Sequence, residues 1–62
     1  MKYKIGDVVW YDDLGDHCKG RVIGIDEESL FPYLVWEIHD GNELYRAWLM
    51  ESDIKGLVIE DV

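Results

Sequence analysis

The apolar residues of this chain fall into short runs, and glycine, proline or aspartate closes each run before a helical spacing can develop. The clearest case surrounds the dipeptide Asp40-Gly41, which separates an alternating apolar run at 33–39 from a second run at 43–49. Asp-Gly between two such runs is a strong signal for a β-hairpin, because glycine accepts the positive φ of a tight turn. An all-β fold is therefore predicted.

The same punctuation divides the rest of the chain. We expect five strands, at residues 4–11, 19–26, 33–39, 43–49 and 55–59. The polar segment 12–18 should form a long first loop, and residues 27–32 a second one. Gly24 breaks the alternation between Val22 and Ile25, which predicts a bulge or sharp bend. Residues 50–54 are expected to form a single 3₁₀ turn, with Ile54 closing one end of the core.

A helix over residues 43–54 is the main alternative, since that segment contains good helix formers. It would remove the hairpin partner of the strand at 33–39, and a lone strand cannot satisfy its backbone hydrogen bonds. The all-β interpretation is therefore preferred.

The length of 62 residues allows one domain, residues 1–62, with one small core. The single cysteine, Cys18, cannot form an internal disulfide, and with His17 and His39 it supplies too few ligands for a structural zinc site. The carboxylates of the segment 12–16 lack the spacing of a calcium-binding EF-hand loop. We therefore expect no metal and no cofactor.

The chain carries 14 acidic and 6 basic residues, a formal net charge of −8. Binding to nucleic acid or to an anionic membrane requires clustered Lys and Arg, so we expect neither. A basic protein or peptide is the expected partner. No apolar segment approaches the length of a membrane span, no signal-peptide core follows Met1, and a free thiol fits a reducing compartment, so a cytoplasmic location is predicted.

The order of strand, loop, strand, loop, hairpin, single turn and strand resembles the SH3-like barrels of the Tudor type, including small stand-alone versions from bacteria and phages. The resemblance rests on the residues 4–9, Gly20-Arg21-Val22, Pro32-Tyr33, Asp40-Gly41, Trp48 and Ser52-Asp53-Ile54. It covers nearly the whole chain and implies a five-stranded SH3-like small barrel with a single 3₁₀ turn before the last strand. These motifs are structural, so they imply a fold more strongly than a ligand.

In Tudor-type barrels, aromatic residues at the strand ends surround a methylated cation or grip a peptide. The resemblance implies a partner-binding surface here, formed by Trp10, Asp12, Asp13, Phe31, Tyr33 and Tyr45. Tyr11, Trp36 and Trp48 are expected in the core or half-buried at its edge. A methyl-cation cage and a more general aromatic patch rimmed by acids both remain open at this stage.

No nucleophile motif or phosphate-binding loop is present, so the chain is not expected to be an enzyme. We expect a non-catalytic protein-interaction module that binds a basic peptide or protein through an aromatic and acidic surface. The alternative is an acidic phage-type inhibitor that mimics DNA to block a host nucleic-acid-binding protein. The apolar run at 56–59 also predicts homodimerisation through an edge strand.

Overall fold

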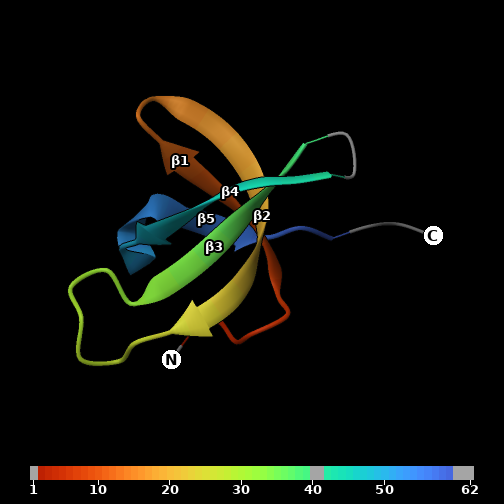
Figure 1. The fold of residues 1–62 in the computed structure, drawn as a ribbon. Helices are drawn as coiled ribbons and strands as arrows, with labels where there is room; N and C mark the ends of the chain where they lie inside the picture. Colours follow the sequence, from red (N-terminus) through yellow and green to blue (C-terminus); the bar gives the residue numbers. More distant parts are fainter. Residues whose placement is uncertain (1, 40–41, 60–62) are drawn as a thin grey trace.

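Five antiparallel strands form one sheet in the computed structural model, which describes residues 2–39 and 42–59 (Figure 1). The strands are β1 (Val8–Asp13), β2 (Asp16–Ile25), β3 (Tyr33–His39), β4 (Asn42–Leu49) and β5 (Ile54–Leu57). Their order in the sheet is β4-β3-β2-β1-β5, and the 3₁₀ turn η1 (Glu51–Asp53) precedes β5. The predicted all-β class, the five strands and the single 3₁₀ turn are confirmed.

The connection between β1 and β2 is a tight turn, and the predicted long loop at 12–18 is wrong. Asp13 pairs with Asp16, and the two residues between them, Leu14 and Gly15, have φ of 51° and 89°. Positive φ at both central positions is the mark of a type I′ hairpin turn, whose twist matches that of the strands. Asp12, Asp13 and Asp16 therefore belong to strands, and these strands extend beyond the core.

The first strand begins later than predicted, because residues 4–7 form a turn. The Asp7 amide donates to the Lys4 carbonyl at 3.1 Å, and the Asp7 carboxylate accepts from the Lys4 amide at 3.0 Å. Gly6 between them has φ of 99°, a conformation that favours glycine. The turn is tied to β2 by two bonds with Val22, each 2.8 Å long.

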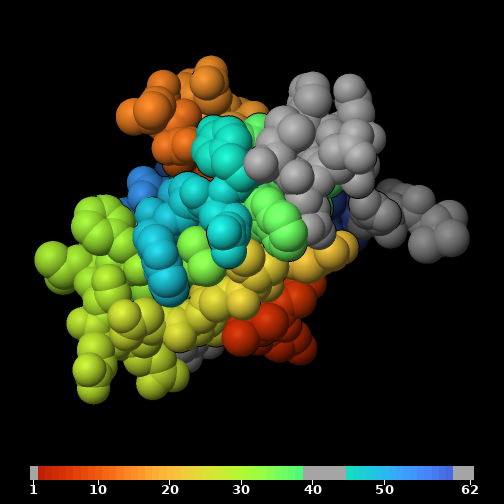
Figure 2. Space-filling model, viewed as in Figure 1, coloured from red at the N-terminus to blue at the C-terminus, as the bar shows by residue number. Residues whose placement is uncertain are grey.

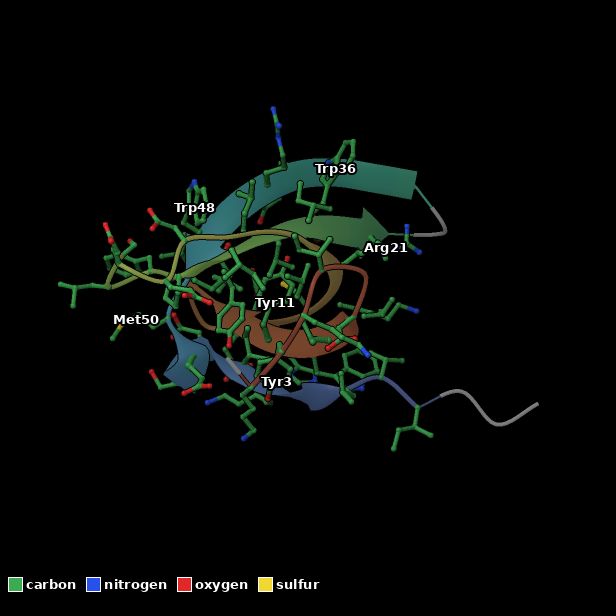
Figure 3. All side chains as sticks on the ribbon, turned by 90° about the horizontal axis from the view of Figure 1, so that it is seen from below. Tyr3, Tyr11, Arg21, Trp36, Trp48 and Met50 are labelled. Atoms are coloured by element: carbon green, nitrogen blue, oxygen red, sulfur yellow. The ribbon has the colours of Figure 1, made fainter. Side chains whose placement is uncertain are left out.

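The middle strand β2 pairs with both β1 and β3, and its irregularity bends the sheet. The register with β3 shifts between Val22 and Gly24, which confirms the predicted bulge. At Gly20 the neighbouring strand lies so close that an added Cβ would be 2.5 Å from Val35 Cγ1 and 2.8 Å from the Trp36 carbonyl oxygen. This close approach helps the sheet to wrap around its inner face, as Figure 3 shows.

The inner face carries the core, which is formed by Tyr3, Val9, Tyr11, Val22, Tyr33, Val35, Leu49 and Ile54. Ile54, which the sequence predicts as a plug, is buried at the end of η1. Tyr11 is buried as predicted. Alternation along each strand sends every second residue inward, so the buried residues of β1 and β3 are two positions apart.

Two aromatic assignments are wrong. Tyr33, expected at the surface, has no exposed area; its ring packs edge-to-face on Tyr3 at 5.6 Å, and its hydroxyl accepts a 3.3 Å bond from the Tyr3 amide. Trp48, expected in or beside the core, is 49% exposed. It pairs with Leu34 on the outer face, because its neighbour Leu49 occupies the inward position of β4.

The last strand, β5, pairs with β1 and ends at Leu57, two residues earlier than predicted. The Val58 amide extends the pairing by one bond of 2.8 Å to the Val8 carbonyl. Leu57 and Ile59 are exposed, consistent with an apolar edge. Homodimerisation through residues 56–59 stays a prediction. The turn at Asp40-Gly41 lies outside the described residues, although His39 pairs with Asn42 on either side of it.

Candidate functional site

Four polar side chains from three strands meet at one end of the inner face. We call them the carboxylate–tyrosine cluster: Tyr11 and Asp13 of β1, Glu37 of β3 and Tyr45 of β4. Each continues the inward alternation of its strand beyond a buried or core-packed residue, namely Val9, Val35 and Ala47. Asp13 and Glu37 therefore occupy inward positions of their strands, where the strand alternation would usually place apolar side chains.

Tyr45 connects two of these strands. Its hydroxyl donates a 3.3 Å bond to Asp13 Oδ2, which links residues 32 positions apart in the sequence. The Glu37 carboxylate, by hydrogen bonding and by its charge, raises the pKa of Tyr45 to about 12, and Asp13 contributes to the rise. The phenol is therefore neutral, and remains a hydrogen-bond donor, throughout the physiological pH range.

Tyr11, labelled inside the curve of the sheet in Figure 3, has no exposed area, and Tyr45 is among its electrostatic neighbours. Burial raises the pKa of its hydroxyl strongly, and the surrounding groups, among them Cys18, Glu37 and Asp13, raise it further. The hydroxyl therefore lies within electrostatic reach of both carboxylates of the cluster.

Two buried atoms of the cluster have no hydrogen-bond partner among residues 2–39 and 42–59: the Tyr11 hydroxyl oxygen and Glu37 Oε1. A buried polar group without a partner costs about 1–3 kcal/mol, and such groups are few in folded proteins. Their presence in one cluster marks it, within the described part of the chain, as a place where buried polar atoms can accept further hydrogen bonds.

Cys18 borders the cluster from β2, where it packs against the core and pairs with Tyr11. Burial raises the pKa of its thiol, and the charge of Glu37 raises it further. Since the thiolate is the reactive form, this environment favours an unreactive cysteine.

The outer face of β1 carries a different arrangement around Trp10, which is 37% exposed. Its ring stacks on His17 at 5.1 Å with an angle of 13° between the planes. Asp12 lies 3.0 Å from His17 Nδ1 and 3.8 Å from Lys55 Nζ. Asp12 is thus already paired with His17 and Lys55, and one face of the Trp10 ring is covered by His17.

The six residues of the predicted partner-binding surface do not form one site. Trp10 and Asp12 lie on the outer face of β1, whereas Asp13 and Tyr45 meet in the cluster. Phe31 is exposed in the β2–β3 loop, at the opposite end of β2 from the β1–β2 hairpin (Figure 1). Tyr33 belongs to the core.

Glu37 is the cluster member that the aromatic interpretation missed. The strand alternation could have identified Glu37, because Tyr33 and Val35 on the same strand are buried and Glu37 is the next residue at two-residue spacing. A carboxylate in phase with buried positions indicates a polar site at the edge of a core.

The outer face of β3 and β4 is turned toward the viewer in Figure 2, and it carries Trp36 and Trp48, which Figure 3 labels. Trp36 and Trp48 point away from the core there, and the Arg46 guanidinium lies 5.9 Å from the centre of the Trp36 ring. The basic neighbour makes this surface a poor match for a cationic ligand.

Within residues 2–39 and 42–59, no group of three or more His, Cys, Asp or Glu side chains is arranged to hold a metal ion. In the same part of the chain, no helix has the length and apolar character that crossing a membrane requires.

Comparisons of the chain with protein-family models, with curated proteins and with solved structures find no match. The SH3-like, Tudor-type identity therefore stays a prediction.

Proposed function

We propose that the protein is a non-catalytic interaction module that binds a basic peptide or protein, and that the carboxylate–tyrosine cluster receives a cationic side chain of that partner. One observation carries the proposal. Glu37 Oε1 and the Tyr11 hydroxyl are buried and have no hydrogen-bond partner within the described residues, and they lie near a second carboxylate, Asp13, and an exposed tyrosine ring, Tyr45.

Electrostatics supports a cation at this position. Two carboxylates, partly shielded from water, attract a positive charge more strongly than exposed carboxylates do. Tyr45, 51% exposed, offers a ring whose face attracts cations. The net charge of −8 adds long-range attraction for a basic partner and speeds encounter.

The distribution of acids favours this proposal over mimicry of DNA. Exposed acids lie at the β1–β2 hairpin (Asp12, Asp16) and in the β2–β3 loop (Asp26, Glu27, Glu28), at opposite ends of β2 (Figure 1). A mimic of a phosphate backbone needs its acids in a continuous array, whereas a cation site needs only a few converging groups.

A binding assay with fluorescein-labelled hexalysine in buffer of physiological ionic strength tests the proposal. Asp13→Asn and Glu37→Gln should each weaken binding about tenfold, as expected when one partner of a desolvated charge pair is removed. The matched control is Glu28→Gln, which removes the same charge from the exposed β2–β3 loop and should change affinity by less than about twofold, because exposed charges are screened.

An equal loss in all three variants would contradict the proposal and indicate non-specific attraction to an acidic protein. A salt titration adds a second criterion. Binding that disappears steeply with salt in the wild type and in every variant would instead favour the mimicry alternative.

A further inference from the structure

The carboxylate–tyrosine cluster has a hydrogen-bonding inventory that constrains the cation it can accept. Glu37 Oε1 is an acceptor with no partner in the part of the chain that the structure describes, and the Tyr11 hydroxyl oxygen can also accept a hydrogen bond. The single Tyr45 proton is engaged by the carboxylates, since the hydroxyl donates to Asp13 Oδ2 and also interacts with the Glu37 carboxylate. A ligand that forms hydrogen bonds with both buried atoms must therefore bring hydrogen-bond donors. On a cationic side chain these donors are N–H groups.

We infer that the site selects a cation bearing N–H groups, the ammonium of lysine or the guanidinium of arginine, and discriminates against a quaternary ammonium such as trimethyl-lysine. The inference rests on the proposed function, which it makes more specific. A trimethylated nitrogen carries no N–H, so it would displace water from Glu37 Oε1 and Tyr11 while leaving both atoms without a partner.

The aromatic geometry leads to the same conclusion. Recognition of a quaternary ammonium uses several ring faces around the cation. Among the residues that the structure describes, only Tyr45 offers an exposed ring beside the cluster. Trp10 is stacked on His17 of β2 on the outer face, and Tyr33 is packed on Tyr3 in the core. The aromatic residues that the sequence suggested for a methyl-cation cage therefore do not converge.

Polar discrimination of this kind is strong, because a site built to hydrogen-bond its ligand is penalised when an analogue lacks the matching group. Three peptides of equal length and charge provide the test: hexalysine, hexaarginine and hexa(trimethyl-lysine). We expect the better of the first two to bind at least about tenfold more tightly than the trimethylated peptide. The stronger of lysine and arginine identifies the natural cation.

Two variants assign the selectivity to the cluster. Tyr11→Phe removes only the buried hydroxyl, and Glu37→Gln removes the charge while keeping the shape. Each should weaken hexalysine or hexaarginine binding more than trimethyl-lysine binding, so the affinity ratio between the two kinds of peptide decreases. Glu37→Gln also weakens trimethyl-lysine binding, because that cation still loses the attraction of the Glu37 charge, but it has no N–H bond to lose. The control Glu28→Gln should leave the ratio at its wild-type value. If the wild type prefers hexalysine or hexaarginine over the trimethylated peptide tenfold or more, and neither cluster variant reduces this preference, then the selectivity does not arise at this site.

The outcomes separate this inference from the proposed function. Binding of all three peptides with equal affinity, or a preference for the trimethylated one, would overturn the selectivity while leaving a cation-binding module. Failure of all three peptides to bind would overturn the proposed function and the selectivity together.

Discussion

Tyr11 and Tyr33 are completely buried on the inner face of this sheet, but only the Tyr33 hydroxyl has a hydrogen-bond partner among the described residues. The Tyr33 hydroxyl accepts a bond from the Tyr3 amide, and its ring packs edge-to-face on Tyr3. The Tyr11 hydroxyl lies near carboxylates whose charge raises its pKa, and it has no hydrogen-bond partner among the described residues. The Tyr33 end of the core is satisfied internally. At the Tyr11 end, buried polar atoms are left without hydrogen bonds, which lowers the stability of the fold. Binding sites commonly show such a cost.

The largest expected effect comes from disturbing the strand that passes beneath Tyr11. Gly20→Ala would place a Cβ 2.5 Å from Val35 Cγ1 and 2.9 Å from Tyr11 Cε1, so the core must shift. We expect a loss of about 3 kcal/mol in the free energy of unfolding, measured by urea denaturation. Gly24→Ala is the matched control, because its nearest contact would be Leu34 Cβ at 3.3 Å. Equal losses at the two glycines would show that the close approach is not the cause.

Removing the two buried hydroxyls tests the comparison directly. Tyr33→Phe deprives the buried Tyr3 amide of its acceptor and should cost about 1–2 kcal/mol. Tyr11→Phe removes a hydroxyl without a partner and should be neutral or stabilise the fold by up to about 1 kcal/mol. Urea denaturation of both variants measures the difference. A larger loss for Tyr11→Phe than for Tyr33→Phe would show that the Tyr11 hydroxyl has a structural role.

Alkaline pH should destabilise the cluster end of the molecule. The pKa of Tyr45 is about 12 in the folded protein against an ordinary value of 10.0, so the unfolded chain loses this proton first. Stability from this group is complete below pH 10 and is lost as pH rises toward 12. The raised pKa of Tyr11 acts in the same direction.

Urea denaturation at a series of alkaline pH values measures this decline, and the phenolate absorbance reports the ionisation itself. Tyr45→Phe should make the decline shallower. An unchanged pH dependence in that variant would mean that Tyr45 does not contribute to the alkaline loss.

The smallest expected effect concerns the hairpin that carries Asp13. Leu14 has φ of 51° and is almost fully exposed, a conformation that disfavours leucine and suits asparagine. Leu14→Asn should stabilise the protein by about 1 kcal/mol, measured by thermal or urea denaturation. Leu30→Asn, at an exposed loop position with negative φ, should leave stability unchanged. A gain of the same size at Leu30 would attribute the effect to surface polarity instead of turn geometry.

Local patterns accounted for much of the fold. Pro32 and the alternation that follows it predicted the strand Tyr33–His39 with its observed bounds, and the 3₁₀ turn and the bulge at Gly24 were also predicted. The hairpin at Leu14-Gly15 was missed, because polar residues in a strand that projects past the core resemble a loop. The pairing of Asp13 with Asp16 and the positive φ values of Leu14 and Gly15 distinguish the hairpin from a loop.

The candidate site was predicted in part. Asp13 and Tyr45 were expected to bind a partner and do meet, but Trp10 and Asp12 lie on the other face of β1. Residues one position apart in a strand point to opposite faces, so an acidic run such as Asp12-Asp13 is divided by the sheet. The run alone does not show which carboxylate turns toward the core.

The sequence by itself determined that the chain forms short antiparallel strands with one 3₁₀ turn, because periodicity and turn residues act over a few neighbouring positions. The tertiary structure decided which aromatic rings are buried, exchanging the predicted places of Tyr33 and Trp48. It also decided that Asp13, Glu37 and Tyr45 converge. Such choices depend on sheet register and curvature, which arise from contacts between residues far apart in the chain.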